Sequence, residues 1–260
     1  MLLLVDVGNT NIVFGIYDQN QLVNSWRMST RIDRSLDELG LLILQFLERK
    51  QVKTEDIQDI IMASVVPQIM YPLCRALKSY VGRNPIVIDG TTDLGMQNKY
   101  DNPQEVGADR LVNAVAAKVL YGTPCIIVDF GTATTFCAID KAGDYLGGAI
   151  LPGIKISLDA LFSKTAKLPK IEIEDPGHLI GTNTVSSMQS GIFYGYVGSV
   201  DYIVTEMAKE LGGQDIKVIA TGGLSSLIFT KSKTIQKIDR NLTLTGLKLI
   251  YDKLKGGTPV

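Results

Sequence analysis

The sequence predicts an α/β protein composed of two similar domains. The chain has 260 residues, which exceeds the needs of one compact two-layer core and suits two domains of modest size. A strand–turn–strand pattern occurs at the N-terminus and again about halfway along the chain, as expected of two domains that are built alike. Apolar strand patterns also alternate with amphipathic helical patterns, which is typical of α/β units.

Composition is that of an ordinary globular protein, with 45% hydrophobic and 20% charged residues, so disordered and fibrous classes are excluded. The formal net charge is −1, from 26 basic and 27 acidic residues. Because neutralisation of phosphate supplies much of the affinity for nucleic acid, a nucleic-acid partner is not expected. The apolar run at the N-terminus ends at Asp6, which is too short for a signal segment. No stretch approaches the roughly 20 apolar residues of a membrane span. We therefore expect a cytoplasmic protein without a membrane partner.

Cysteine and histidine usage restricts the chemistry further. Cys74, Cys125 and Cys137 form no CxxC pair, which indicates reduced and mostly buried thiols. His178 is the sole histidine, so a histidine-rich metal site and any mechanism with two imidazoles are excluded.

The internal repeat is the most informative pattern. Residues 3–10 and 126–133 share an aliphatic run that ends in Asp-x-Gly and continues with small polar residues. A second apolar run follows in each case, at 12–16 and at 135–139. The alternative is that two unrelated α/β domains both begin with a strand and an Asp-Gly turn. We expect domains at residues 1–118 and 119–260, joined by a packed hinge.

The remaining segments fit α/β units. Ser35 and Glu38 form a capping-box pattern ahead of apolar residues at helical spacing, which predicts a helix with one buried face. Apolar runs predict strands at 59–66, 84–88 and 216–220. Helices are predicted at 109–120, 200–211 and 241–254.

The first Asp-x-Gly turn suits an anionic ligand. Gly8 lets the backbone approach a ligand closely, and the amides that follow can point together at phosphate oxygens. Asp6 at the strand end can hold Mg²⁺ through water. The alternative is a hairpin turn in which Asp and Gly serve geometry only.

Two later turns strengthen this interpretation. Residues 129–135 offer Gly131 and three hydroxyl side chains, and Gly222 and Gly223 follow the apolar strand at 216–220. Neither GxxxxGK[ST] nor GxGxxG occurs, so a P-loop or a Rossmann dinucleotide site is unsupported. The pair of Asp-x-Gly turns therefore predicts a phosphate-binding site to which both domains contribute.

The ordered motifs resemble the type III pantothenate kinase family of the actin, Hsp70 and sugar kinase superfamily. They cover nearly the whole chain and occur at residues 6–11, 64–67, 100–110, 129–135, 147–153, 180–184 and 221–223. This resemblance implies two actin-like, ribonuclease H-like domains with mixed central sheets and an ATP cleft between them. It also implies ATP-dependent phosphorylation of pantothenate to 4'-phosphopantothenate, the first step of coenzyme A biosynthesis, by a homodimer.

The resemblance also implies roles for individual residues. Asp109 corresponds to the catalytic base and Asp129 to the ligand of a monovalent cation, K⁺ or NH₄⁺. The ATP contacts implied are Asp6, Val7, Gly8, Asn9, Thr10, Asn11, Ile12, Val13 and Thr132. The pantothenate contacts implied are Tyr100, Gly107, Ala108, Asp109, Arg110 and Thr184.

Alternatives remain open at this stage. From the residues alone, a helix N-cap is the leading interpretation of Asp109, although both roles can hold at once. Arg110 either pairs with the pantothenate carboxylate or steadies a loop. The same family includes a non-catalytic transcription accessory factor. Other small-molecule kinases and filament-forming proteins share the superfamily.

Overall fold

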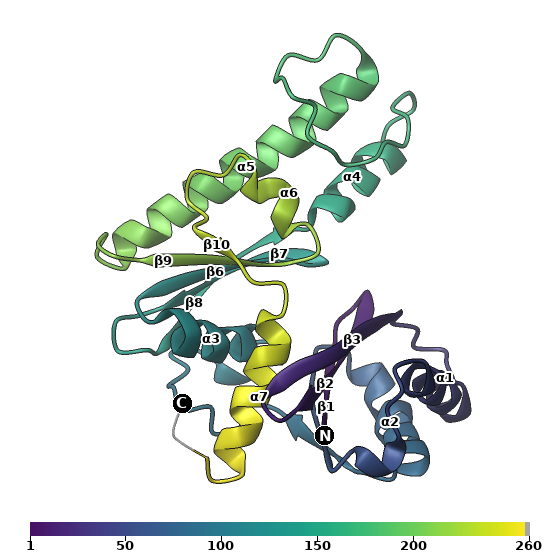
Figure 1. Ribbon diagram of the computed structural model, residues 1–260. Coiled ribbons are helices and arrows are strands. Elements are labelled where there is room, and N and C mark those ends of the chain that lie inside the picture. Colours follow the sequence, from purple (N-terminus) through teal and green to yellow (C-terminus); the bar gives the residue numbers. More distant parts are fainter. Residues whose placement is uncertain (258–260) are drawn as a thin grey trace. The chain divides into compact units, whose positions relative to one another are not determined.

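The computed structural model describes residues 1–257 and divides the chain into two compact units. Unit 1 comprises Met1–Met96, Asp101–Ala116 and the C-terminal segment from Thr243. Unit 2 comprises Gln97–Tyr100 and Ala117–Leu242. Each unit contains one five-stranded sheet (Figure 1). Within the described residues, no helix has both the length and the apolar character needed to cross a membrane.

Unit 1 is built on a mixed sheet with the strand order β3-β2-β1-β4-β5. The neighbours β1–β2 and β2–β3 are antiparallel, whereas β1–β4 and β4–β5 are parallel. The strands are β1 (Leu2–Val7), β2 (Asn11–Asp18), β3 (Gln21–Ser29), β4 (Asp59–Ser64) and β5 (Pro85–Ile88), and the helices are α1 (Leu36–Arg49), α2 (Pro67–Ala76), most of α3 (Ala108–Tyr121) and α7 (Leu242–Leu254).

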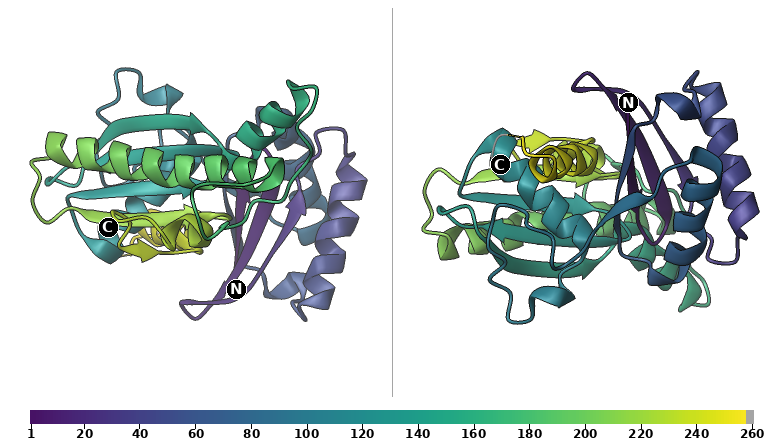
Figure 2. Two further views of the ribbon diagram at one scale, coloured as in Figure 1. Left: turned by 90° about the horizontal axis from the view of Figure 1, so that it is seen from above. Right: turned by 90° about the horizontal axis from the view of Figure 1, so that it is seen from below.

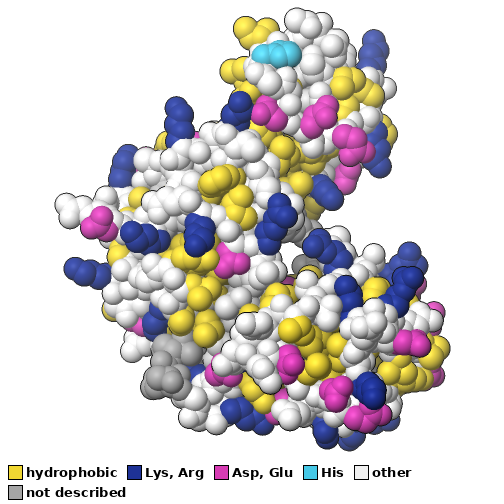
Figure 3. Space-filling view, viewed as in Figure 1, with side chains coloured by type: hydrophobic (Ala, Val, Ile, Leu, Met, Phe, Trp, Pro, Cys, Tyr) yellow, Lys and Arg dark blue, Asp and Glu magenta, His cyan; other side chains and the backbone are white. Residues whose placement is uncertain are grey.

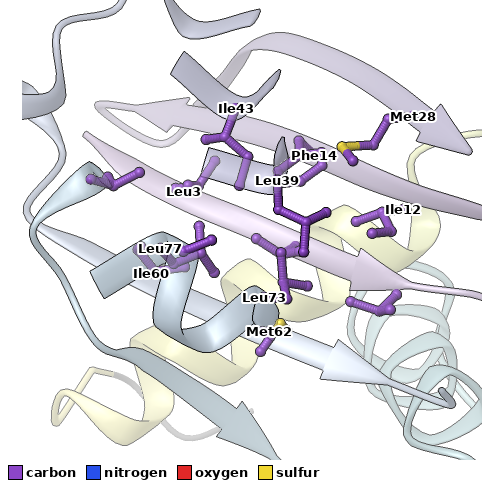
Figure 4. Packing of buried hydrophobic residues seen from close by; sticks show 14 of the residues in the cluster. Leu3, Ile12, Phe14, Met28, Leu39, Ile43, Ile60, Met62, Leu73 and Leu77 are labelled. Carbon is purple, nitrogen blue, oxygen red and sulfur yellow. The ribbon is translucent and has the colours of Figure 1, made fainter. Parts of the chain in front are cut away.

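Helices cover both faces of this sheet because β1 is apolar on both sides. Leu3 and Val5 face α1 and α2, whose buried side chains complete one core (Figure 4). The capping box predicted for α1 is present, since Ser35 and Glu38 exchange hydrogen bonds. On the opposite face, Gly15 pairs with Leu4 and lies against Leu244 of α7.

Unit 2 repeats this topology with the strand order β8-β7-β6-β9-β10. The neighbours β6–β7 and β7–β8 are antiparallel, and β6–β9 and β9–β10 are parallel. The strands are β6 (Cys125–Phe130), β7 (Ala133–Ile139), β8 (Tyr145–Pro152), β9 (Lys217–Gly222) and β10 (Lys237–Ile238), and the helices are α4 (Ile154–Ser163), α5 (Thr184–Glu210) and α6 (Ser225–Phe229).

The long helix α5 crosses one face of the unit 2 sheet (Figures 1 and 2). Its apolar stripe, which includes Phe193, Val197 and Val200, packs on Val128 and Phe136 of the strands. The predicted helix at 200–211 is therefore only the second half of α5. The first half is rich in Gly and Ser, which lowers helix propensity, and packing against the sheet overrides that preference.

The shared topology confirms the predicted fold class of two similar α/β units with mixed sheets. In both units, the first strand pairs antiparallel with the second and parallel with the fourth. The Asp-x-Gly turn follows that central strand each time. The sequence repeat is therefore a repeat of structure rather than a chance match.

The compact units differ from the contiguous domains expected at 1–118 and 119–260, because α7 packs in unit 1. Tyr251 donates a hydrogen bond to Asp59 at 2.6 Å. Thr243 donates one to Asn113 of α3 at 2.8 Å. Gly246 lies so close to the Val112 backbone that a side chain there would clash. The apolar face of α7 thus covers the first sheet.

Candidate functional site

The first Asp-x-Gly turn connects β1 and β2 in unit 1. The Gly8 amide donates to the Asn11 carbonyl at 3.0 Å, which closes the turn. Thr30, which directly follows β3, supports the turn, because its hydroxyl donates to the Gly8 carbonyl at 2.6 Å and its amide donates to the Thr10 carbonyl at 2.9 Å. Thr10 and its neighbour Asn9 are exposed. The turn is therefore fixed in shape while its polar side chains remain accessible to a ligand.

The other ATP contacts implied by the motif have different environments. Val7 and Ile12 are buried in the core of unit 1, and Val13 and Asn11 are half-buried. Since the Ile12 side chain is fully buried, any contact of this residue with a nucleotide would come from its backbone.

Asp6 lies at the carboxyl end of β1, where it pairs with Val13 of β2 and Ala63 of β4. Residues that lie directly opposite each other in neighbouring strands point to the same face of the sheet. Residues two positions apart in one strand also point to the same face. Asp6 is therefore on the same face as Leu4 and Gly15, which is covered by α7. Because α7 packs on α3, Asp6 and α3 lie on one side of the sheet.

Asp109 lies in the first turn of α3. Its Oδ1 accepts the Arg110 amide at 2.7 Å. Gly107 precedes it, and a Cβ there would lie 2.6 Å from that same oxygen and 3.2 Å from the Val65 side chain. The Val65 amide in turn donates to the Val7 carbonyl at 3.0 Å. The start of α3 is thus packed beside the ends of β1 and β4, where the first turn also begins.

Burial raises the pKa of the Asp109 carboxyl above its usual range, and the Arg110 amide and guanidinium oppose that shift only in part. A carboxylate of raised pKa is a better proton acceptor for an alcohol than an ordinary one. Asp109 is not the N-cap of α3, because the helix begins at Ala108 and Asp109 lies inside its first turn, where its carboxylate accepts the amide of the next residue. Ala108 is buried and Arg110 is only 7% exposed, so both help to position this helix start.

The second Asp-x-Gly turn lies in unit 2 between β6 and β7. Asp129 pairs with Thr135 of β7 and with Thr221 of β9, so two threonine side chains share its face of the sheet. Gly222, which has a φ of +88°, lies over Asp129, and a Cβ there would be 2.6 Å from Asp129 Oδ1. The structure therefore brings together the second Asp-x-Gly turn and the Thr-Gly-Gly turn.

Thr132 follows in the same turn and contacts the end of β8. A Cβ on Gly153 would clash with the Thr132 carbonyl, so glycine is needed where the chain leaves β8 for α4. The glycine-rich segment at 147–153 thus supports the second turn at its far end.

Tyr100 and Thr184, the other candidates in unit 2, do not join this cluster. The Tyr100 ring lies 3.3 Å from the Cβ position of Gly147, six residues before Gly153, which is about 20 Å along an extended strand. Thr184 starts α5 and lines a cavity of about 640 Å³. That cavity is lined by Leu161, Leu168, Gly181, Thr182, Asn183, Thr184, Ser187, Met188, Gly191 and Ile192.

The sequence did not identify Thr30 as a residue of the first turn, because Thr30 follows β3 and belongs to no local motif. Thr135 and Thr221 belong to the predicted motifs at 129–135 and 221–223, but their position beside Asp129 was not predicted. It follows from the pairing register of β6 with β7 and β9, which the sequence alone does not specify.

Similar solved structures share this fold over their full length. One is a putative Baf family transcriptional activator from Campylobacter jejuni, with 21% identity, a TM-score of 0.60, and coverage of 98% of this chain and 99% of that chain. Another is a putative 2-dehydro-3-deoxygalactonokinase from Sinorhizobium meliloti, with 13% identity, a TM-score of 0.60, and coverage of 98% and 97%. These identities support a common fold only. The duplicated topology and its likeness to such kinases define an actin-like ATPase fold of the sugar kinase type.

A sequence profile resolves the family. The profile described as type III pantothenate kinase matches residues 2–206, which is more than half of the chain. The chain therefore belongs to the type III pantothenate kinase family, a family of kinases whose use of ATP and a divalent metal fits the two Asp-x-Gly turns.

Proposed function

We propose that the protein transfers the γ-phosphoryl group of ATP to the primary hydroxyl of pantothenate, giving 4'-phosphopantothenate and ADP in the first step of coenzyme A biosynthesis. Family membership supports the substrate. The observation that carries the proposal is the half-buried carboxylate of Asp109, held at the start of α3 beside the ends of β1 and β4.

In this mechanism, Asp109 orients the pantothenate hydroxyl and accepts its proton. The hydroxyl oxygen bonds to the γ-phosphorus, the bond from that phosphorus to the bridging oxygen breaks, and ADP leaves. Phosphoryl transfer needs positioning and charge neutralisation more than covalent help. The proton therefore passes to Asp109 late in the reaction, when the hydroxyl has become more acidic.

The proposed ATP contacts come from both turns. Amides and side chains of residues 8–11 suit phosphate oxygens, and Thr132 supplies a hydroxyl in the second turn. Mg²⁺, held through water by Asp6, would neutralise charge on the phosphates. A monovalent cation such as K⁺ prefers oxygen ligands, and Asp129 with its neighbours Thr135 and Thr221 provides a fitting donor set.

Pantothenate contacts are proposed for Tyr100, Arg110 and Thr184, together with the backbone at Gly107 and Ala108. The buried guanidinium of Arg110 is a suitable partner for a carboxylate. We also propose that the chain acts in the cytoplasm.

We further propose a homodimer as the active assembly. Apolar side chains are exposed at the end of unit 2 that is formed by α4 and the beginning of α5 (Figure 3). Leu179 is 65% exposed and Ile180 82%, and Phe162 and Val185 are also exposed. Exposed apolar surface of this kind commonly marks a protein interface. Sedimentation equilibrium of the protein and of an Ile180→Glu variant tests this proposal, and a monomeric wild type would refute it.

The central test is ADP release with pantothenate, measured for the wild type and for Asp109→Asn. We expect turnover to fall by about 10²- to 10⁴-fold, the usual contribution of general acid–base catalysis, while calorimetry shows ATP binding retained. Asp101→Asn is the matched control, because Asp101 is exposed in the same motif. Unchanged turnover in Asp109→Asn would remove this residue from the mechanism.

A panel of acceptors tests the substrate separately. We expect ADP release with pantothenate and little with other small hydroxy acids or hexoses. Turnover of a sugar alone would identify a different kinase of the superfamily, and absence of turnover with every acceptor would support a non-catalytic relative.

A further inference from the structure

Residues Gln97–Tyr100 form a short segment of unit 2 that is flanked on both sides by residues of unit 1. The segment lies along the outer edge of β8 in a parallel arrangement, where Asn98 pairs with Tyr145. The Tyr145 amide donates to the Gln97 carbonyl at 2.9 Å, and the Lys99 amide donates to the Tyr145 carbonyl at 2.8 Å. It therefore extends the sheet of unit 2 by one short edge segment.

Two hydrogen bonds are a weak attachment by themselves, and an ion-pair cluster adds to them. Lys99 Nζ lies 2.8 Å from Asp140 Oδ2 and 2.9 Å from Asp144 Oδ2. Asp144 also accepts the Gln97 amide at 3.0 Å, and its own amide donates to Asp140 at 2.9 Å. One lysine thus joins the segment to both carboxylates of the β7–β8 hairpin.

The two carboxylates make this lysine more important than an isolated surface partner. Their charges repel each other, since Asp140 opposes ionisation of Asp144. Hydrogen bonds to Asp140 and Asp144 raise the pKa of Lys99 above its usual range, so the lysine stays charged at neutral pH. Without it, two adjacent anions would face the backbone of the segment.

The segment ends at Tyr100, whose position depends on this attachment. Its amide donates to the Asn98 side chain at 3.1 Å, and its half-buried ring packs on the backbone of Gly147. Gly147 has a φ of +131° and no side chain, which leaves room for the ring. Immediately after Tyr100 the chain returns to unit 1, so the segment is attached to unit 2 by these contacts and not by the chain that directly follows it.

We propose that Lys99 is a positioning residue, which fastens residues 97–100 to the β7–β8 hairpin and thereby holds Tyr100 where it contacts pantothenate. This inference rests on the proposed function for the identity of the substrate. It assigns Lys99 no contact with the reacting atoms. Because the ion pairs of Lys99 are with the β7–β8 hairpin, we expect the fastening to affect substrate affinity and to leave the chemical step unchanged.

The test replaces Lys99 by Met, which keeps the length of the side chain and removes its charge. A single exposed ion pair contributes little, but Lys99 makes two that hold the same short segment. We therefore expect the KM for pantothenate to rise by about threefold to tenfold, with kcat and the KM for ATP unchanged. Amide hydrogen exchange at Gln97 and Tyr145 should accelerate by a similar factor, whatever substrate the protein uses.

Two variants serve as controls. Lys99→Arg keeps the charge and should restore both the KM and the exchange rates. Lys209→Met removes a comparable exposed pair with Glu206 in the same unit and should change neither. If the amide exchange rates are unchanged in Lys99→Met, Lys99 does not fasten the segment to the hairpin. If exchange accelerates but the KM for pantothenate is unchanged, the fastening does not position Tyr100. A wild type that does not consume pantothenate refutes the proposed function, while the exchange rates still decide the role of Lys99.

Discussion

The two central strands end in the same backbone arrangement but in different chemical surroundings. Asp6 of β1 is flanked by Val13 and Ala63, whereas Asp129 of β6 is flanked by Thr135 and Thr221. One pairing further along, Val7 faces Ile12 and Phe130 faces Thr134.

Topology places one carboxylate at each strand end, and the neighbouring side chains differ. Under the proposed function, the hydroxyl neighbours of Asp129 would offer direct oxygen ligands to a cation of low charge. The apolar neighbours of Asp6 would leave it to act through bound water, which suits Mg²⁺.

The largest effect is expected from replacing each aspartate in turn. Asp6→Asn and Asp129→Asn should each lower kcat/KM by about 100-fold, because charge stabilisation by bound metal is worth several kcal/mol. Only Asp129→Asn should also abolish stimulation by K⁺. ADP release in potassium and in choline buffers measures both effects, and an equal loss of K⁺ stimulation in Asp6→Asn would contradict the division of roles.

A smaller effect is expected at the ends of β4 and β9. Ser64 pairs with Val7 in unit 1, and Gly222 pairs with Phe130 at the corresponding place in unit 2. Gly222→Ala should destabilise the protein by about 1–3 kcal/mol and raise the KM for ATP, because of its positive φ and the crowding against Asp129. Urea denaturation measures the stability.

The adjacent glycine provides the control for this substitution. A Cβ on Gly223 would meet no atom within 4 Å, so Gly223→Ala should change stability by less than about 0.5 kcal/mol. Equal costs at the two glycines would show that the turn is not crowded against Asp129.

Each unit also has a partly buried tyrosine–aspartate hydrogen bond, Tyr251 to Asp59 in unit 1 and Tyr121 to Asp239 in unit 2. Tyr251→Phe and Tyr121→Phe should each cost about 1 kcal/mol, measured by urea denaturation. Burial, together with the hydrogen bond to the aspartate, raises the pKa of both tyrosines to about 12.

The raised pKa of each tyrosine determines how the stability contributed by its hydrogen bond depends on pH. The folded pKa exceeds the usual value of 10, so the stabilisation is complete below pH 10 and is lost as the pH rises toward 12. The difference in the free energy of unfolding between the wild type and each Phe variant should therefore disappear across that pH range. A constant difference between wild type and variant up to pH 12 would be the contrary result.

The smallest effect concerns Thr134 and its counterpart Ile12. The Thr134 hydroxyl is buried without a hydrogen-bond partner among the described residues, whereas Ile12 fills the core of unit 1. Thr134→Val should stabilise the protein by about 1 kcal/mol, since it removes an unsatisfied polar atom. The reverse change, Ile12→Thr, should destabilise it. Thermal unfolding compares the two, and loss of stability in Thr134→Val would indicate a polar role for that hydroxyl.

The fold was largely predictable because it is encoded by local patterns. The repeated Asp-x-Gly pattern predicted the two sheets, and the capping box predicted α1. The second half of α5 and the start of α3 followed from apolar periodicity. Assignment of α7 to unit 1 was not predictable, because it depends on contacts such as Tyr251 with Asp59 that lie far apart in the sequence.

For the candidate site, the sequence predicted the motifs but not the packing around them. The turn at Gly8 and the acidic residue of the 107–110 segment could be identified from residue types and spacing. The burial that raises the pKa of Asp109 could not, because it depends on how the start of α3 packs in the folded unit. The attachment of Lys99 to two carboxylates some 40 residues away could not be predicted from local sequence patterns either.

The interleaving of the chain has a consequence for how the protein can be divided. The first and the last of the described residues lie in unit 1, and the backbone passes between the units at four points, after Met96, Tyr100, Ala116 and Leu242. A cut at residue 118 would leave the first fragment without α7, exposing Leu4 and Gly15, and the second fragment with a helix that has lost its partner. Such halves should be insoluble when produced alone and should recover function when co-expressed, as a split enzyme.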